Sequence, residues 1–111
     1  MPPALAICQR FQVEPQAPVP GTRVGLAIET LKKSPIHGLR VHPTSTTNGW
    51  YLWCGERSDS DDFFSPLCVE HLPDSLPEVL PYLALPPGYR FVIDKNGYED
   101  VWYDSELLAW Q

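Results

Sequence analysis

The chain has 111 residues and a mass of 12.6 kDa, a size that fits one domain. With 43 % hydrophobic and 20 % charged residues it can build a core, which excludes a fully disordered protein. No apolar run approaches the roughly 18 residues that indicate a membrane helix, and the first residues show no secretory signal. We therefore expect one domain over residues 1–111, in the cytoplasm and without a membrane partner.

Charge is distributed unevenly along the chain. Residues 1–55 carry five basic and two acidic side chains, whereas residues 56–111 carry three basic and twelve acidic ones, a net charge of −9. The overall charge of −6 weighs against nucleic acid as a partner, because binding phosphates requires a basic surface. An acidic half suits a basic protein partner, since complementary charge steers the encounter, and it equally serves plain solubility.

The N-terminal third contains two short apolar stretches separated by prolines. Ala4–Phe11 predicts an edge strand, and Pro15–Gly21 predicts an extended loop, so residues 1–21 form a Pro-rich segment that we expect to be loosely ordered. Thr22–Lys33 fits a helical face and strand alternation equally well. The two lysines at its end, followed by Pro35, slightly favour a helix.

The middle of the chain predicts one well-covered strand. A short extended piece is expected near Leu39–Val41, and Asn48-Gly49 is typical of a turn. Gly49–Gly55 predicts a strand that is apolar on both faces and therefore central. Its faces carry Trp50, Leu52 and Cys54 on one side and Tyr51 and Trp53 on the other. An acidic loop, Glu56–Asp62, follows this strand.

The C-terminal part begins with another short strand, Pro66–His71. Ser75 and Glu78 have the spacing of a capping box ahead of a short helix that Pro81 would kink. Asn96-Gly97 between two alternating segments is the clearest hairpin signal in the chain, because Asn-Gly supplies the positive φ of a tight turn.

The hairpin strands are Tyr89–Asp94 and Tyr98–Tyr103, and Asp104–Gln111 predicts a final helical turn that Asp104 or Ser105 caps. Leu107, Leu108 and Trp110 should pack back from this turn onto the domain. The elements together predict an α+β fold: an antiparallel sheet of about four or five short strands with one or two short helices on one face.

Two kinds of chemistry compete with a purely structural role for the cysteines and histidines. Cys68 and His71 have a usable metal-ligand spacing, but no second pair matches it, and residues three apart on a strand point to opposite faces. The other soft ligands are His37, His42 and Cys54. A nucleophilic site assembled from Cys68, His71 and Asp100 lacks any surrounding nucleophile motif. We therefore expect no catalytic residue, no metal and no cofactor.

A binding surface fits the residues better. Four tryptophans and five tyrosines are many for this length, and several stand beside carboxylates, which suits a basic partner. The alternative is that most rings fill a small core, as we expect of Trp50 and Phe91 together with Val101. The predicted partner-binding residues are Trp53, Glu56, Asp59, Asp61, Asp62, Tyr98, Glu99 and Asp100.

Several blocks of the sequence together resemble one bacterial family. The blocks are Pro35–Arg40, Gly49–Glu56, Asp61–Phe64, Pro66–Leu72, Pro77–Leu83, Leu85–Phe91 and Gly97–Asp104. Over residues 22–108 they are similar to the immunity proteins numbered thirty-three in their series, with the Imm-thirty-three-like relatives.

The resemblance implies a non-enzymatic cytoplasmic protein that binds and blocks a cognate toxin of a polymorphic-toxin system, here a basic toxin domain. It supplies no catalytic residues. Two alternatives remain open: a general protein interaction module or orphan domain without a toxin, and an enzyme or metal protein built on Cys68 and His71. Genomic context distinguishes an immunity protein from an interaction module without a toxin. Metal analysis and thiol reactivity test whether the chain is an enzyme or a metal protein.

Overall fold

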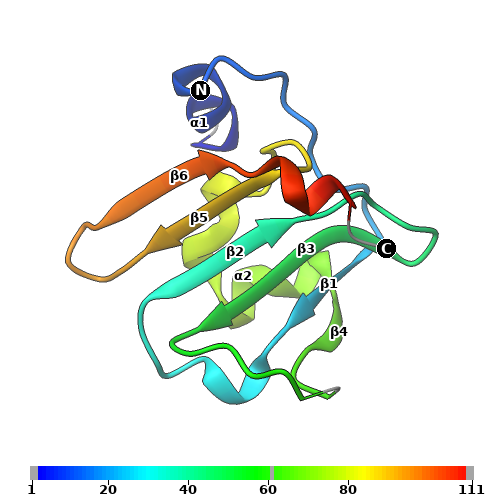
Figure 1. The fold of residues 1–111 in the computed structure, drawn as a ribbon, viewed down its shortest axis with the longest axis vertical. Helices are drawn as coiled ribbons and strands as arrows, with labels where there is room; N and C mark the ends of the chain where they lie inside the picture. The colour runs from blue at the N-terminus through cyan, green and yellow to red at the C-terminus, as the bar shows by residue number, and fades with distance from the viewer. Residues whose placement is uncertain (1–2, 61, 110–111) are drawn as a thin grey trace.

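Six strands form a single mixed sheet in the computed structural model, which describes residues 3–60 and 62–109 (Figure 1). The strand order is β4-β1-β3-β2-β5-β6, and every neighbouring pair is antiparallel except β1 and β3, which run parallel. The strands are β1 (Arg23–Leu26), β2 (Ile36–Arg40), β3 (Thr47–Cys54), β4 (Ser65–Cys68), β5 (Tyr89–Ile93) and β6 (Glu99–Tyr103).

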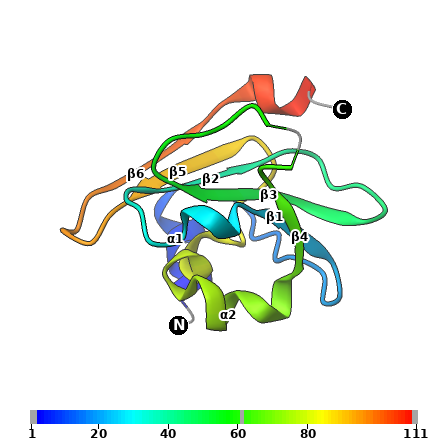
Figure 2. The same cartoon turned by 90° about the horizontal axis from the view of Figure 1, so that it is seen from below.

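Short helices connect and cover the strands. They are α1 (Pro3–Arg10) and α2 (Leu72–Ser75), with the 3-10 segments η1 (Ile28–Thr30), η2 (Val69–His71), η3 (Pro77–Tyr82) and η4 (Ser105–Ala109). The α+β class is thus confirmed, whereas the expected antiparallel sheet of four or five strands is replaced by a mixed sheet of six. Figure 2 shows α1 and α2 on one side of the sheet and the C-terminal turn on the other.

The segment Thr22–Lys33 forms a strand followed by a 3-10 turn, so the slight preference for a helix was wrong. Val24 and Leu26 are fully buried on one face of β1. Gly25 between them lies under the ring of Tyr51, where an added Cβ would come within 2.6 Å of a ring carbon. The alternation of buried residues with a period of two, as in a strand, therefore describes this segment, and pairing with β3 stabilises the strand.

The first apolar stretch is also different from its prediction. Ala4–Phe11 was expected as an edge strand, but residues 3–10 form α1, which packs on η3. Ile7 and Cys8 are buried there, and Phe11 is half-buried against the same cluster. These positions share one helical face, and the tertiary contact rather than intrinsic propensity selects the helix.

Asn48-Gly49 does not form a turn, because both residues lie inside β3. Gly49 has φ +93, and a Cβ there would lie 2.1 Å from the carbonyl oxygen of Val41. The register of β1 against β3 shifts beside this point, which is the signature of a bulge. The positive φ expected of Asn-Gly is present, but it lies inside a buried strand and does not reverse the chain.

The proline-containing segment after β4 differs from the expected capped helix. The strand ends at Cys68 rather than His71, and α2 precedes a 3-10 helix whose first residue is Pro77. No side-chain hydrogen bond caps η3, so the capping box predicted from Ser75 and Glu78 does not form. Two prolines in six residues remove the donors of an α-helical ladder, which leaves a 3-10 segment.

The C-terminal hairpin is confirmed. β5 and β6 pair from Tyr89 with Tyr103 to Ile93 with Glu99, and Gly97 has φ +87 in the turn. The carboxylate of Asp94 accepts the backbone N–H groups of Asn96 and Tyr98 at 2.8 and 3.0 Å, which closes the turn.

The expected final turn is also present, as a 3-10 helix. Asp104 accepts the N–H of Glu106 at 3.1 Å, and Leu107 is buried against the sheet face opposite to α1. Trp110 lies outside the described residues.

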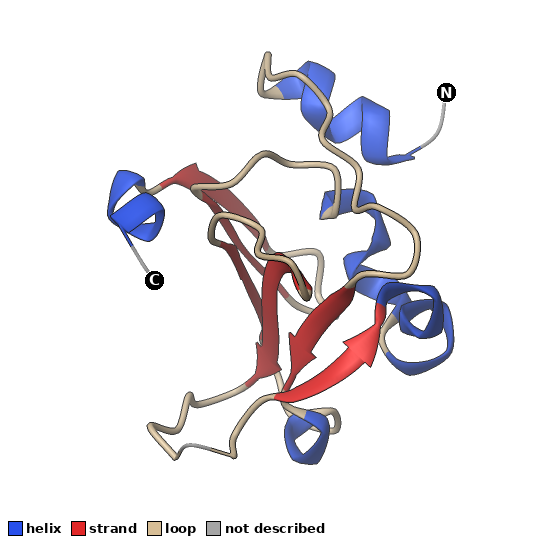
Figure 3. Ribbon diagram, turned by 90° about the vertical axis from the view of Figure 1, so that its right-hand side faces the viewer, coloured by secondary structure: helices blue, strands red, loops and turns tan. Residues whose placement is uncertain are grey.

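Strand β3 separates two cores, as its apolar faces predict. Trp50, Leu52 and Cys54 join the larger core beneath the helices, whereas Trp53 belongs to a smaller cluster on the opposite face. Figure 3 shows helices near both faces of the sheet. Of the residues expected in the core, Trp50 and Phe91 are fully buried and Val101 is partly buried.

A buried arginine joins the outer segments to the sheet. Arg40 is 3 % exposed, and its guanidinium donates to the carbonyl oxygens of Gln16 (2.6 Å), Leu85 (2.8 Å) and Asn48 (3.0 Å). The group also lies over the ring of Trp50 at 5.6 Å. Burial lowers the pKa of Arg40 to about 10, so the side chain stays charged at neutral pH. One cation thus holds the Pro-rich segment against the core.

Candidate partner-binding surface

The two acidic segments singled out in the sequence leave the sheet at the same end. β2 is antiparallel to both β3 and β5, so these two strands end side by side, with Ile36 paired to both Cys54 and Ile93. The acidic loop follows β3 and the hairpin turn follows β5 (Figure 1). We call this region, from the loop at residues 56–60 and 62 to the turn at residues 94–98, the sheet-end surface.

A polar hollow of about 420 Å³ lies beside the acidic loop within this surface. It combines three carboxylates with two cations. The lining residues are Glu29, Thr30, Lys33, Glu56, Arg57, Ser58, Ser60, Asp62 and Phe63. Thr30 forms a fixed part of the wall, because its buried hydroxyl donates to Ala27 and accepts the N–H of Cys54. The hollow can therefore receive a charged or polar side chain from a partner.

Aromatic rings anchor the acidic loop on the sheet. Phe64 packs edge-on against Tyr51 and Trp53, with ring centroids 5.1 and 6.0 Å apart, and Phe63 packs on Phe64 at 4.9 Å. Arg57 lies over the rings of Trp53 and Phe64 at 5.5 and 5.9 Å. The rings face the sheet, while Glu56, Asp59 and Asp62 are exposed.

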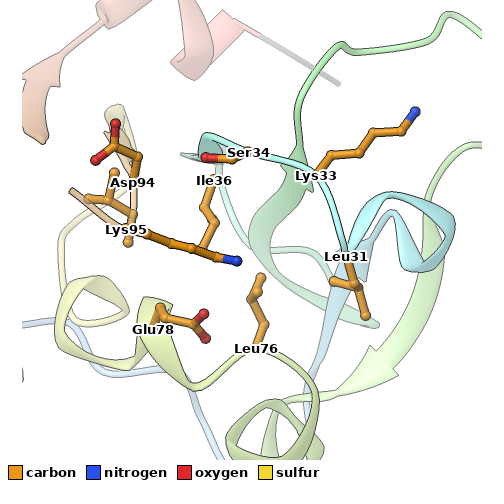
Figure 4. Close-up of a pocket in the computed structure, with 9 residues that line it drawn as sticks. Leu31, Lys33, Ser34, Ile36, Leu76, Glu78, Asp94 and Lys95 are labelled. Carbon is orange, nitrogen blue, oxygen red and sulfur yellow. The ribbon is translucent and has the colours of Figure 1, made fainter. Parts of the chain in front are cut away.

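A small, mainly apolar pocket of about 60 Å³, the apolar pocket, shares one lining residue, Lys33, with the hollow. Ile36 and Leu76 point into it from opposite sides, and Glu78 and the chain of Lys95 border it (Figure 4). The volume suits the tip of one aliphatic side chain rather than a cofactor. A pocket of this kind beside a charged hollow is a common anchor point in protein interfaces.

The structure places the predicted site residues in different environments. Trp53 is 4 % exposed and stacks on His37 with centroids 5.0 Å apart, and it also contacts Arg57 and Phe64 at the two ends of the acidic loop. Its burial follows from the two-sided cover of β3. Asp61 lies outside the described residues.

The hairpin residues are also unequal. Tyr98 is 53 % exposed and Asp100 is exposed as well. Glu99 forms an ion pair with Arg10 and accepts the hydroxyl hydrogen of Tyr82 at 2.5 Å. The hydrogen bond from Tyr82, and after it the one from Arg10, lowers the pKa of Glu99. Burial, together with the hydrogen bond to Glu99, raises the pKa of Tyr82. Glu99 therefore serves an internal contact that ties α1 and η3 to β6.

Sequence reasoning missed six charged residues of this surface, two of which, Arg57 and Asp94, belong to the acidic loop and to the start of the hairpin turn. The other four come from separate segments. Glu29 and Lys33 lie in or after η1, in a segment favoured as helix, and Glu78 was assigned to a capping box. Lys95 was regarded only as a turn residue. No local pattern could have found them, because the pairing of distant strands brings them together.

The thiol and imidazole groups lie in different surroundings within the described part of the chain. Within residues 3–60 and 62–109, no group of three or more His, Cys, Asp or Glu side chains is arranged to hold a metal. Cys8 and Cys54 are buried, and burial raises the pKa of both thiols. Cys68 ends β4, while His71 lies in the following 3-10 turn. None of the helices described is both long and apolar enough to cross a membrane.

Fold and surface together define a small α+β domain with a charged hollow and an apolar pocket at one end of its sheet. The family model of the Imm33-like domain matches residues 4–104 of the sequence, and the chain therefore belongs to the Imm33-like family. No curated protein and no solved structure matches the chain. The family resemblance stated from the sequence is thereby confirmed.

Proposed function

We propose that this chain is a non-enzymatic immunity protein that binds a cognate bacterial toxin domain in the cytoplasm and neutralises it by covering its surface. Membership of the Imm33-like family over residues 4–104 is the observation that carries the proposal. The toxin is proposed to be basic, because the second half of the chain has a net charge of −9.

The sheet-end surface is the proposed contact region. Glu56, Asp59 and Asp62 project from the acidic loop. Asp61 is proposed as a further contact residue from the sequence alone. The hollow beside the loop accepts a basic side chain between its carboxylates, and the apolar pocket accepts an aliphatic anchor from the same partner. Such an arrangement combines charge steering with a buried contact.

Tyr98 and Asp100 extend this surface along the hairpin. Both lie on the side of the hairpin turn, next to the end of β5 that borders the apolar pocket. Trp53 and Glu99 contribute by holding the loop and the hairpin in place, because each is engaged in contacts within the chain.

Co-expression with the neighbouring toxin gene tests the proposal. The C-terminal domain of a large toxin encoded beside this chain should co-purify with it, and the chain should restore growth of cells that produce that domain. A chain carrying Glu56→Gln and Asp62→Asn should protect less well than one carrying Glu14→Gln and Glu106→Gln, which loses the same charge at exposed sites elsewhere. Growth inhibition that the wild-type chain does not relieve would contradict the proposal.

A further inference from the structure

Strand β6 forms one edge of the sheet and has a neighbour on one side only. Two backbone hydrogen bonds bracket its pairing with β5: Asp94 N–H to Tyr98 O at 3.1 Å and Asp104 N–H to Gly88 O at 2.7 Å. Bonded and non-bonded pairs alternate along an antiparallel ladder. The backbone N–H and C=O groups of Glu99, Val101 and Tyr103 therefore point away from β5, towards the open edge.

Exposed aromatic side chains accompany this open edge. Tyr98 is 53 %, Trp102 37 % and Tyr103 52 % exposed, although large apolar side chains usually avoid such positions. The rings are held in place: Arg90 lies over Trp102 at 5.6 Å, and Tyr103 packs edge-on against Tyr89 at 5.4 Å. Rings that are already ordered lose little conformational freedom when a partner covers them.

The opposite edge of the sheet, β4, is better protected against pairing with a further strand. β4 has only four residues, and one of them is Pro66, which has no N–H group to offer a further strand. β6 has five residues and contains neither proline nor lysine, the two residues that commonly guard an edge. The contrast marks β6 as the edge that is open to pairing.

Charge identifies the kind of strand that suits this edge. Residues 96–111 contain four carboxylates and no lysine or arginine. Asp104 is paired with Arg90 at 3.1 Å and Glu99 with Arg10, whereas Asp100 is exposed beside Trp102 on the same face of the strand. A strand with basic side chains gains from these carboxylates, while a second copy of this chain, with its charge of −6, is repelled.

We infer that the free edge of β6 binds an extended, basic segment of the partner by adding it to the sheet as a seventh strand. The inference rests on the proposed function, because the partner is taken to be the toxin domain. Backbone hydrogen bonds to Glu99, Val101 and Tyr103 supply the pairing, and contacts with Trp102 and Asp100 select basic and apolar side chains.

A synthetic peptide of about seven residues, alternating lysine and valine, serves as the probe. Its binding should slow amide hydrogen exchange at Glu99, Val101 and Tyr103, the groups at the open edge, measured by NMR. The same peptide methylated at every backbone nitrogen keeps its side chains and charge but has no backbone N–H to donate to the edge, so it should bind at least about tenfold more weakly. Equal binding of the two peptides, or no slowing of exchange with millimolar peptide, would overturn the inference.

Two variants at one position test the edge on the protein side. Tyr103→Pro removes an outward N–H without breaking a bond to β5, whereas Tyr103→Ser removes the ring and keeps the N–H. Tyr103→Pro should weaken peptide binding about tenfold relative to Tyr103→Ser, provided that the two unfold at similar urea concentrations. If they differ in unfolding, the methylated peptide decides alone. Protection of these amides in a dimer without peptide would show that a second copy occupies the edge, which overturns the inference.

The same variants separate this inference from the proposed function. Toxin that binds the wild-type chain and Tyr103→Pro equally well would overturn the edge pairing and leave the immunity role intact. Toxin that fails to bind the wild-type chain would overturn the immunity role, and the peptide measurements would then decide the edge pairing by themselves.

Discussion

Arg40 is the residue on which the arrangement of the outer segments depends most. Its guanidinium is surrounded by carbonyl oxygens from three separate stretches of chain, and among residues 3–60 and 62–109 no carboxylate is hydrogen-bonded to it. Without it the carbonyl oxygens of Asn48 and Leu85 would lose a buried donor, which costs more than the hydrogen bonds themselves contribute. The carbonyl oxygen of Leu83 would keep the indole N–H of Trp50 at 3.0 Å.

We expect Arg40→Met to lower the free energy of unfolding by about 2–4 kcal/mol, because the buried carbonyl oxygens of Asn48 and Leu85 lose their guanidinium donor. Arg23→Met is the matched control, since Arg23 is exposed and should change stability by less than about 0.5 kcal/mol. Urea denaturation of both variants measures the difference. Similar denaturation midpoints for the two variants would show that the hydrogen bonds of Arg40 do not stabilise the packing of the outer segments.

Glu99 predicts a pH dependence of stability. Its pKa is lowered in the folded chain, so its contribution is present above the ordinary glutamate pKa and is lost as pH falls through the lowered value. The stability difference between the wild-type chain and Glu99→Gln should therefore be larger near neutral pH than at about pH 3. Unfolding free energies at several pH values measure it, and a difference that does not change with pH would contradict the assignment.

The hairpin turn predicts an effect at the scale of an element. Gly97 has φ +87 and open space where a Cβ would lie, so strain in the backbone is the only obstacle to a side chain. Gly97→Val should cost about 1–3 kcal/mol, because a β-branched residue fits this region poorly. Lys95→Val is the control in the same turn. An unchanged denaturation midpoint for Gly97→Val would show that the turn tolerates the strain.

The elements that could be predicted are those with local signals. β3 has apolar residues on both faces, and the β5–β6 hairpin has Asn-Gly at its turn, so each was recognised from a few neighbouring residues. α1 and β1 were assigned the wrong type because short apolar stretches fit both periods, and contacts with η3 and β3 decide between them. Asn48-Gly49 shows that a positive φ can belong to a bulge as readily as to a turn.

The candidate site was predicted only in part, because local sequence signals do not show which distant residues the sheet brings together. The carboxylates of the loop and hairpin were visible as acidic runs, but Glu29, Lys33 and Glu78 join them only through the order of strands in the sheet. Trp53 and Glu99 were selected for their residue types, and only the structure shows that internal contacts occupy both. Sequence patterns therefore indicated the acidic nature of the surface better than which residues form it.

At the scale of the whole molecule, the charged surface and the open edge share the acidic half of the chain. In the proposed complex, the sheet-end surface supplies carboxylates for a basic partner, and β6 supplies backbone groups for pairing with it. Long-range attraction acts on the rate of association, whereas pairing and ring contacts act on the lifetime of the complex. The two contributions can therefore be measured separately.

Tyr98→Ala should affect the lifetime of the complex. If the exposed ring is covered by the toxin domain, its loss should speed dissociation by about tenfold, with little change in the association rate. Surface plasmon resonance with the toxin domain separates the two rates. An unchanged dissociation rate would place Tyr98 outside the contact.

The most direct test of the central claim is the association rate of this chain with the toxin domain, measured by stopped-flow fluorescence at several salt concentrations. Glu56→Gln with Asp62→Asn should slow association several-fold at low salt, by about three- to tenfold, and flatten its salt dependence. The control pair Glu14→Gln with Glu106→Gln, which removes the same charge from other exposed sites, should have a much smaller effect. Equal rates for both pairs and the wild-type chain at low salt would contradict the claim that the sheet-end surface receives the toxin.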